Sequence, residues 1–373
     1  MYIILTQCFP SRFGGIESLV SNLALNLGKK NNTIVFADQH HILRDSIYDN
    51  QNKDLISIRR FGGIKFFRRR KKIKELKIFI ESKQVKLVIA DSWKSLELGI
   101  DYLNEKNIPT ICLAHGNELL SNEEKKSKRI SQTLEKASSV IANSKFTMSL
   151  VKKIIPKNNN INFVYPGAID LRQKTKSNSF LKIEGKPVLI TLARLEKRKG
   201  HAEILKTIKK LTSDFPTIQY IIAGEGPEKP YLKKIVKEKE LSTNVVFLGL
   251  INDAQKKFLF EVVDLMIMPT LDETEKQSIE GFGIAYLEAA FFAIPSIASK
   301  AGGTPEAVLH KSTGIIINSF DELYDCTRKL LQDNDERISL GQNAQRRSLE
   351  EFHWDVVINN YLSIFSNIIE KKR

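Results

Sequence analysis

Cysteine is scarce in this sequence. The 373 residues contain three cysteines, Cys8, Cys112 and Cys326, which lie far apart and form no CxxC pair. Scattered cysteines in an odd number predict neither a disulfide framework nor a zinc site, because both need cysteines in pairs or close clusters. We therefore expect reduced thiols in a cytoplasmic protein, and no bound metal.

Long apolar stretches are also missing. No run approaches the ~20 residues that a membrane-spanning helix needs. The first residues, MYIILTQCFP, contain no basic leader, only a short apolar stretch and no small-residue cleavage site, so a signal peptide is not expected. The length of the chain favours two domains, at roughly 100–200 residues each.

Acidic residues are too few to balance the basic ones. Lys and Arg total 58 against 43 Asp and Glu, a formal net charge of +15. Such an excess predicts an anionic partner, namely nucleic acid, an acidic membrane or a phosphorylated ligand. The excess is densest in residues 59–77, here called the basic segment, which has one acid, Glu75. Its ten cations are Arg59, Arg60, Lys65, Arg68, Arg69, Arg70, Lys71, Lys72, Lys74 and Lys77.

Apolar residues are interleaved with these cations. They are Phe61, Ile64, Phe66, Phe67, Ile73, Leu76 and Phe79. From about Lys65 onward we expect a basic amphipathic helix, or a loop and a helix, that lies on an anionic bilayer. The alternative is a solvated basic face whose phenylalanines pack against the core.

Short apolar runs typical of strands alternate with helical patterns along most of the chain. In the first half, the expected strands are 2–5, 33–37, 86–90, 110–114, 140–143 and 162–165. After a polar stretch at 171–179 they are 188–192, 219–223, 244–248, 265–269, 296–298 and 314–317. The alternation predicts two α/β halves, each a parallel sheet covered by helices, with a boundary near 166–180. An amphipathic helix is expected at 354–369.

Glycine-rich turns follow several expected strands, where ligands bind in doubly wound sheets. Gly14 and Gly15 lie between the first strand and the first helix, so backbone N–H groups there can approach a phosphate. A tight turn would use the same residues. The pattern is not the GxGxxG of ordinary dehydrogenases.

A second glycine-rich turn contains Gly224, Glu225 and Gly226, directly after the expected strand 219–223. It permits close approach of a base or ribose, although it is also a common turn between a strand and a helix.

Three polar side chains are placed in the same way. His115 follows the expected strand 110–114, and its imidazole would lie at the rim of a cleft. Arg194 and Lys199 follow 188–192 and suit a pyrophosphate, since arginine offers a forked charge and lysine a compact one. The alternatives are a structural histidine and a solvated basic loop that also contains Lys197 and Arg198.

The segment EGFGIAYLEA at 280–289 places two glycines just before an expected helix. The amides of Phe282, Gly283 and Ile284 would then be available to an anion or to hydroxyl groups. Glu280 precedes the helix and Glu288 lies one turn into it. Both carboxylates can face one cleft, where one would bind sugar hydroxyls and the other a ribose diol.

In their order, these motifs resemble the retaining GT-B glycosyltransferases of family 4. The resemblance rests on FGGIES at 13–18, AHGNE at 114–118, VYPGAID at 164–170, LARLEKRKG at 192–200, IIAGEGP at 221–227, NVVFLG at 244–249, MPT at 268–270, EGFGIAYLEA at 280–289 and GGTPEAV at 302–308. Two glutamates separated by seven residues are that family's hallmark. Within it, the chain looks most like the phosphatidylinositol mannosyltransferase branch, which uses GDP-mannose.

The resemblance implies an α/β fold of two Rossmann-like, doubly wound domains facing a cleft, with a C-terminal helix that crosses back to the first domain. Residues 1–170 with helix 355–373 would form the acceptor-side domain, and residues 171–354 the domain that binds the nucleotide-sugar.

The resemblance also implies roles for single residues. Catalytic positions would be His115, which faces the sugar, Arg194 and Lys199, which hold the pyrophosphate, and Glu280, which holds the transferred sugar. Donor-binding positions would be Gly14 and Gly15 for phosphate, Gly224, Glu225, Gly226 and Phe247 around the base, the amides of Phe282, Gly283 and Ile284, and Glu288 for ribose. No metal and no cofactor beyond the donor is implied.

The expected function is transfer of a hexose, with mannose from GDP-mannose as the first candidate, to a glycan or lipid-linked acceptor. The enzyme would be cytoplasmic or peripheral on the inner face of the cell membrane. One alternative is another GT-B enzyme that uses a UDP-sugar. The other is a basic nucleic-acid-binding protein, which is less favoured because no helix-turn-helix, RRM or KH pattern is present.

Overall fold

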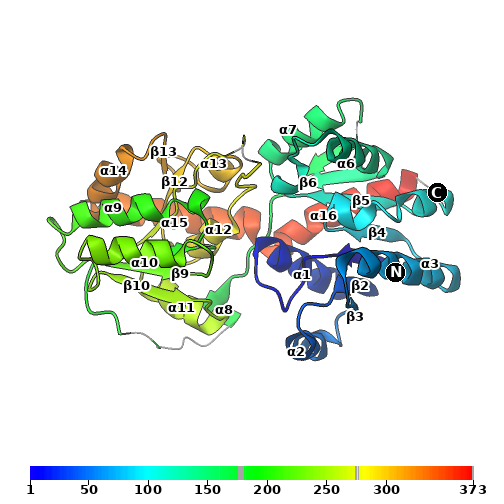
Figure 1. Ribbon diagram of the computed structural model, residues 1–373, viewed down its shortest axis with the longest axis horizontal. Helices are drawn as coiled ribbons and strands as arrows, with labels where there is room; N and C mark the ends of the chain where they lie inside the picture. Colours follow the sequence, from blue (N-terminus) through cyan, green and yellow to red (C-terminus); the bar gives the residue numbers. More distant parts are fainter. Residues whose placement is uncertain (159, 175–179, 181, 274, 276, 372–373) are drawn as a thin grey trace. The chain divides into compact units, whose positions relative to one another are not determined.

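The computed structural model describes residues 1–158, 160–174, 180, 182–273, 275 and 277–371. Internal contacts divide the chain into two compact units. Unit 1 comprises Met1–Gly167 and Trp354–Arg373, and unit 2 comprises Ala168–His353. Each unit is a parallel β-sheet with helices packed on it (Figure 1).

The sheet of unit 1 has seven parallel strands in the order β3-β2-β1-β4-β5-β6-β7. They are β1 (Tyr2–Thr6), β2 (Thr33–Asp38), β3 (Ser57–Phe61), β4 (Leu87–Ala90), β5 (Thr110–Ala114), β6 (Ser139–Ala142) and β7 (Ile161–Phe163). Most central strands are buried along their whole length. Strands covered on both faces need apolar side chains at every position, which explains the continuous apolar runs in the sequence.

The helices of unit 1 include one from the far end of the chain. They are α1 (Gly15–Gly28), α2 (Ile42–Asn52), α3 (Lys65–Ser82), α4 (Trp93–Leu96), α5 (Ile100–Glu105), α6 (Glu124–Lys136), α7 (Lys145–Ile154) and α16 (Trp354–Lys371), with a 3₁₀ turn η1 (Asn117–Leu119). Helix α16 lies beside α1 (Figure 1). The Phe365 ring of α16 meets the Tyr2 ring of β1 edge-on, with 6.1 Å between centroids. The expected return of the C-terminal helix to the first domain is confirmed.

The basic segment begins on a strand that the sequence did not reveal, and the helix expected from about Lys65 is α3 (Lys65–Ser82). Arg59 and Arg60 lie on β3, at the edge of the sheet. The Arg59 guanidinium lies over the Phe36 and Phe79 rings, 5.7 and 5.0 Å from their centroids, and Arg60 pairs with Asp49 at 2.7 Å. An edge strand tolerates charged side chains, and these charges hide the apolar pattern of a strand.

The sheet of unit 2 has six parallel strands in the order β10-β9-β8-β11-β12-β13. They are β8 (Val188–Leu192), β9 (Gln219–Ala223), β10 (Val245–Gly249), β11 (Leu265–Ile267), β12 (Ser296–Ser299) and β13 (Gly314–Ile317). In both sheets the order of the strands reverses beside the first strand, β1 or β8. Doubly wound folds bind ligands at this position, beyond the carboxyl ends of the strands.

The helices of unit 2 enclose a core of aliphatic side chains from these strands. They are α8 (Leu171–Lys174), α9 (His201–Leu211), α10 (Lys229–Glu238), α11 (Asp253–Val262), α12 (Ile284–Ala290), α13 (Thr304–Ala307), α14 (Glu322–Gln332) and α15 (Asn334–Arg347), with the 3₁₀ turn η2 (Lys197–Lys199) and the π-helical turn η4 (Ser348–Phe352). Within the described ranges of both units, every helix is too short or too polar to cross a bilayer.

Candidate functional site

Two loops interlock at the carboxyl ends of β8 and β9. The Leu195 amide donates to the Glu225 carbonyl at 3.0 Å, and the Glu228 amide donates to the Leu195 carbonyl at 3.0 Å. A Cβ at Gly224 would lie 1.9 Å from the Ala193 carbonyl oxygen, and one at Gly226 would lie 2.4 Å from that of Leu195. Both glycines therefore allow the loops to pack closely, a structural role beside the expected contact with a base.

The loop after β8 places two cations against one carboxylate. Lys199 Nζ lies 2.5 Å and Arg198 Nη1 lies 2.8 Å from the same Glu280 oxygen, Oε2. All three side chains are largely buried. Burial raises the pKa of the Glu280 carboxyl, but the charges of Lys199 and Arg198 outweigh it and hold that pKa at about 2. Glu280 is therefore an anion at neutral pH, fixed between two cations.

Arg198 joins Lys199 at Glu280, whereas the resemblance implied Arg194 as the partner of Lys199 at a pyrophosphate. The Arg194 side chain is 60 % exposed and pairs at 2.9 Å with Glu196, whereas that of Arg198 is 8 % exposed. The Arg198 Nε is 3.3 Å from the other Glu196 oxygen, so Glu196 links the two guanidinium groups. The structure joins Lys199 to Glu280, two residues to which the resemblance gave separate roles, and adds Arg198, which the sequence left in a solvated loop.

A second loop fixes the backbone of Glu280. The Gly303 amide donates to the Glu280 carbonyl at 2.9 Å. Gly302 adopts a φ of +55°, and a Cβ there would lie 2.1 Å from the same carbonyl oxygen. The turn after β12 therefore needs glycine in order to hold the Glu280 backbone.

Helix α12 begins at the glycine pair that follows Glu280. Gly283 has a φ of +99°, and a Cβ there would lie 2.6 Å from the Tyr286 ring, so this position too requires glycine. The buried Phe282 ring packs edge-on against Phe352, with 5.8 Å between centroids. Ile284 is the first residue of α12.

Glu288 on α12 forms an ion pair of its own. Its Oε1 lies 2.6 Å from Nζ of Lys256 on α11, and both side chains are largely buried. Burial lowers the pKa of Lys256, but the Glu288 carboxylate outweighs it and the pKa is raised. Lys256 gave no signal in the sequence, because the pair joins residues 32 apart on different helices.

The other residues expected around the base lie on β10 and on the turn after β9. Glu225 forms an ion pair with Lys229 at 2.6 Å. Phe247 is a half-buried residue of β10 and packs against the core of unit 2.

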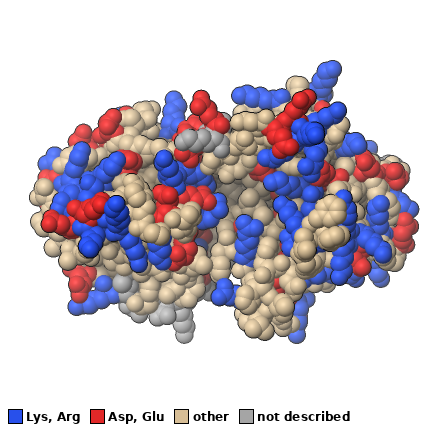
Figure 2. Space-filling model, in the orientation of Figure 1, with Lys and Arg blue, Asp and Glu red and all other residues tan. Residues whose placement is uncertain are grey.

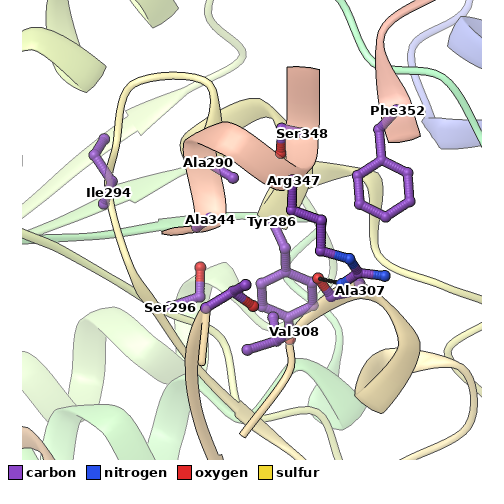
Figure 3. Close-up of a pocket in the computed structure, with 11 residues that line it drawn as sticks. Tyr286, Ala290, Ile294, Ser296, Ala307, Val308, Ala344, Arg347, Ser348 and Phe352 are labelled. Atoms are coloured by element: carbon purple, nitrogen blue, oxygen red, sulfur yellow. Dashed lines mark hydrogen bonds between the residues drawn. The ribbon is translucent and has the colours of Figure 1, made fainter. Parts of the chain in front are cut away.

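A cavity behind α12 is part of the core rather than a ligand site. It measures about 10 Å³, room for about one water molecule. Figure 3 shows the Tyr286 ring and the Arg347 guanidinium beside it, with Arg347 donating to the Ala307 carbonyl at 3.2 Å.

The residues expected in unit 1 lie at the corresponding strand edge there. The His115 backbone amide donates to Glu118 Oε1 at 2.6 Å. The Nε2 atom of the His115 ring lies 2.8 Å from the Asp91 carbonyl oxygen. A carbonyl only accepts, so Nε2 carries the proton and the buried ring is held in one orientation.

Gly14 and Gly15 lie at the start of α1, beside a carboxylate. A Cβ at Gly14 would lie 2.2 Å from Oε2 of Glu17, which pairs with Arg12 at 2.9 Å. This carboxylate is already next to the amides that were expected to meet a donor phosphate.

In the described part of the chain, no group of three or more His, Cys, Asp or Glu side chains is arranged so that it could hold a metal ion.

Family models match both halves of the chain. The model described as "Glycosyltransferase Family 4" matches residues 13–171, and "Glycosyl transferases group 1" matches residues 172–347. The chain belongs to the family 4 glycosyltransferases. Both clusters around Glu280 and Glu288 lie in the half matched by the group 1 model.

Curated proteins with similar sequences differ in the activities that their names give. A Mycobacterium tuberculosis GDP-mannose-dependent alpha-(1-6)-phosphatidylinositol monomannoside mannosyltransferase is 27 % identical over 174 residues, 46 % of this chain and 45 % of the relative. A Bacillus anthracis N-acetyl-alpha-D-glucosaminyl L-malate synthase is 24 % identical over 274 residues, 71 % of this chain and 69 % of the relative. The chain thus matches less than half the length of the mannosyltransferase.

Solved structures match the fold over nearly the whole chain. The Anabaena protein Alr3699/HepE in complex with UDP and glucose gives a TM-score of 0.82 at 19 % identity, covering 98 % of this chain and 99 % of that one. Sucrose-phosphate synthase from Thermosynechococcus elongatus gives 0.81 at 18 %, covering 99 % of each chain. These matches confirm the expected fold of two Rossmann-like domains.

Proposed function

We propose that this family 4 glycosyltransferase transfers a hexose, with mannose from GDP-mannose as the first candidate, to a glycan or lipid-linked acceptor with retention at the anomeric carbon. Unit 2 would bind the donor and unit 1 the acceptor. The observation that carries the proposal is the cluster in which Lys199 and Arg198 hold the Glu280 carboxylate.

The chemistry of the donor explains why such a cluster is useful. When the bond between the anomeric carbon and the β-phosphate oxygen breaks, negative charge grows on the leaving diphosphate. Cations that are fixed before the reaction stabilise this charge without reorganising. The three cations Arg194, Arg198 and Lys199 outnumber the two carboxylates Glu196 and Glu280, which leaves a surplus of one positive charge.

The remaining groups follow from the same assignment. Glu280, an anion with a pKa of about 2, accepts hydrogen bonds from the hydroxyls of the transferred sugar. Glu288 accepts from the ribose diol, beside Lys256. The acceptor hydroxyl attacks from the face that the diphosphate leaves, and a diphosphate oxygen takes its proton. Because the cations belong to the chain, no divalent ion is needed.

A UDP-sugar is the second candidate donor. It is favoured by the Anabaena structure, which binds UDP and glucose, while GDP-mannose is favoured by the named activity of the mycobacterial relative. Glu288 would bind the ribose of either nucleotide.

Contact with an anionic membrane, on the inner face of the cell membrane, completes the proposal. Ile64, Phe66 and Phe67 at the start of α3 are 73, 55 and 65 % exposed, and Lys71 and Lys74 lie exposed further along α3. Lys and Arg side chains lie over this part of unit 1 in Figure 2. Apolar side chains at the lipid interface with lysines near phosphates are the arrangement that such binding uses.

Other members of the basic segment are engaged inside unit 1 and are unsuitable for testing membrane contact. Arg68 and Lys72 pair with Asp38 at 2.9 and 2.5 Å, and Arg69 pairs with Glu97 at 2.8 Å. Phe61, Ile73, Leu76 and Phe79 belong to the core.

The suitable variant is therefore Phe66→Ser with Phe67→Ser, Lys71→Ser and Lys74→Ser. It should no longer pellet with anionic liposomes and should still bind nucleotide. Equal pelleting of the wild type with neutral and anionic liposomes would contradict membrane binding.

Product analysis tests the proposed transfer. The protein is incubated with GDP-mannose or UDP-glucose and a pool of lipid and glycan acceptors, and the products are measured by mass spectrometry. A hexose added to an acceptor by the wild type and lost in Lys199→Ala is the expected result. Lys197→Ala is the matched control, because Lys197 is an exposed cation of the same loop. The absence of any transferred sugar with either donor would contradict the proposal.

A further inference from the structure

Three helices of unit 1 are joined by one carboxylate. Glu97, at the end of α4, pairs with Arg69 of α3 at 2.8 Å and with Arg129 of α6 at 2.5 Å. Arg69 also donates to the Lys94 carbonyl at 2.6 Å. The relative positions of α3, α4 and α6 are therefore fixed by hydrogen-bonded ion pairs.

One turn before each member of this network stands a lysine. Lys65 lies four residues before Arg69, Lys94 three before Glu97 and Lys126 three before Arg129. Side chains separated by three or four helical residues share a face. The ion pairs that bring together Arg69, Glu97 and Arg129 thus also gather the three lysines, here called the lysine cluster.

The positive charges of the lysine cluster repel one another. Lys94 is half-buried. Its pKa is lowered by burial first and then by the charges of Lys65 and Lys126, an effect that Glu118 opposes. Lys126 donates to the Leu120 carbonyl at 3.2 Å, and the Lys94 ammonium lies 5.7 Å from the centre of the Trp93 ring. Among the described residues, no ion pair with a carboxylate is found for any of the three lysines. The network of Arg69, Glu97 and Arg129 therefore holds three lysines without a paired carboxylate on adjoining helices, an arrangement that an anion would stabilise.

The lysine cluster lies at the edge of the sheet where ligands bind. Helices α3, α4 and α6 are the next α-helices after β3, β4 and β5, so their first turns, which contain Lys65, Lys94 and Lys126, lie toward the carboxyl ends of the strands. His115 follows β5 at the same edge, and its Nε2 lies 2.8 Å from the carbonyl oxygen of Asp91, which follows β4.

We propose that Lys65, Lys94 and Lys126 form a binding site for a phosphate group carried by the acceptor. Three ammonium groups from three elements match the three charged oxygens of a phosphate, and each lysine serves as a compact point charge. The identification of the phosphate as part of the acceptor rests on the proposed function. Binding of a phosphate at this site does not.

Titration with inorganic phosphate, followed by ³¹P NMR line width, tests the site. Saturating GDP is present, so that the cations of unit 2 are occupied. Lys94→Gln and Lys126→Gln should each raise the Kd for phosphate roughly tenfold or more, the effect of losing one charge-assisted hydrogen bond. Lys128→Gln is the matched control on α6, since Lys128 is exposed and lies on another face, and it should leave the Kd unchanged. Equal phosphate binding by Lys94→Gln and Lys128→Gln would overturn the proposal.

Competition shows where the phosphate comes from. Glycerol 3-phosphate represents a soluble acceptor, and phosphatidic acid in phosphatidylcholine vesicles represents a lipid headgroup. Displacement of inorganic phosphate by either one supports the site, and displacement by neither contradicts it.

GDP binding is measured in parallel, so that the two proposals fail separately. If the protein binds GDP but its phosphate binding does not depend on Lys94, the site in unit 1 alone is overturned. If phosphate binding depends on Lys94 but the protein does not bind GDP, the proposed donor site alone is overturned.

Discussion

The two units hold their cations in different ways. In unit 2, Lys199 and Arg198 share one oxygen of a buried carboxylate. In unit 1, the charges of Lys65 and Lys126 lower the pKa of Lys94, and no ion pair is found for any of the three lysines among the described residues. A paired cation is held in place before the reaction, which suits charge that grows in a transition state. An unpaired cluster keeps its full charge, which suits an anion that is already formed.

Removing the shared carboxylate should have the largest effect. Glu280→Ala leaves the buried Lys199 without a carboxylate partner and leaves Arg198 with Glu196 alone, and we expect the free energy of unfolding to fall by about 3 kcal/mol. Glu280→Gln should fold better and lower kcat on the order of 10²–10³-fold, because the charge that orients Lys199 and Arg198 is lost.

Chemical denaturation and initial rates measure the two effects. Glu350→Gln is the control in unit 2, since Glu350 is exposed. A Glu280→Gln variant with wild-type kcat would mean that the pairing in unit 2 is structural only, and the contrast with unit 1 would lose its functional meaning.

Removing the paired cations one at a time sharpens the contrast. Lys199→Ala should lower kcat/KM on the order of 10²–10³-fold, the range for losing a group that stabilises transition-state charge. Arg198→Ala should come close to it, because Arg198 contacts the same Glu280 oxygen. Steady-state kinetics with Lys197→Ala as the control measure this. A large loss of kcat/KM in Arg194→Ala and a small loss in Arg198→Ala would mean that the exposed Arg194, and not Arg198, stabilises the transition state.

Acid should break the pairing in unit 2. The pKa of Glu280 is lowered from its usual 4.5 to about 2, so its contribution to stability is complete above pH 4.5 and is lost as the pH falls through 2. The difference in unfolding free energy between wild type and Glu280→Gln should shrink over this range. Denaturation at a series of pH values measures it, and a difference that does not change with pH would contradict the paired state.

The Lys256–Glu288 pair should have a smaller effect on the donor. Glu288→Gln should weaken nucleotide binding roughly tenfold with little change in kcat, because a ribose contact acts in the ground state. Calorimetric titration with GDP and UDP measures it. A larger change in kcat than in Kd would mean that Glu288 contacts the reacting sugar.

Chelation should have no effect. Transfer should persist in excess EDTA, because the cations of the chain take the place of a metal ion in stabilising the diphosphate. Loss of activity that Mg²⁺ or Mn²⁺ restores would contradict the role given to Lys199 and Arg198.

Much of the fold could be predicted from sequence wherever both faces of a strand are buried. The expected ranges 110–114, 188–192, 219–223 and 314–317 coincide with β5, β8, β9 and β13. Strand β3 could not be found in this way, because Arg59 and Arg60 are accommodated by aromatic rings and by Asp49 that other elements bring to them.

The candidate site was predictable only in part. Lys199 and Glu280 each follow a strand, and the structure joins them. In the run Lys197-Arg198-Lys199, however, the 3₁₀ turn η2 decides that the last two side chains turn inward, and composition cannot show this. The lysine cluster was hidden for a similar reason, because Lys65, Lys94 and Lys126 meet only through the packing of α3, α4 and α6.

Binding of a nucleoside diphosphate tests the central claim most directly, namely that unit 2 binds the donor through Lys199 and Arg198. GDP and UDP are titrated calorimetrically into the wild type, Lys199→Ala and Lys197→Ala. The wild type and Lys197→Ala should bind at least one of the two nucleotides with equal affinity, and Lys199→Ala should bind it at least roughly tenfold more weakly. Failure of the wild type to bind either nucleotide, or equal binding by Lys199→Ala, would contradict the claim.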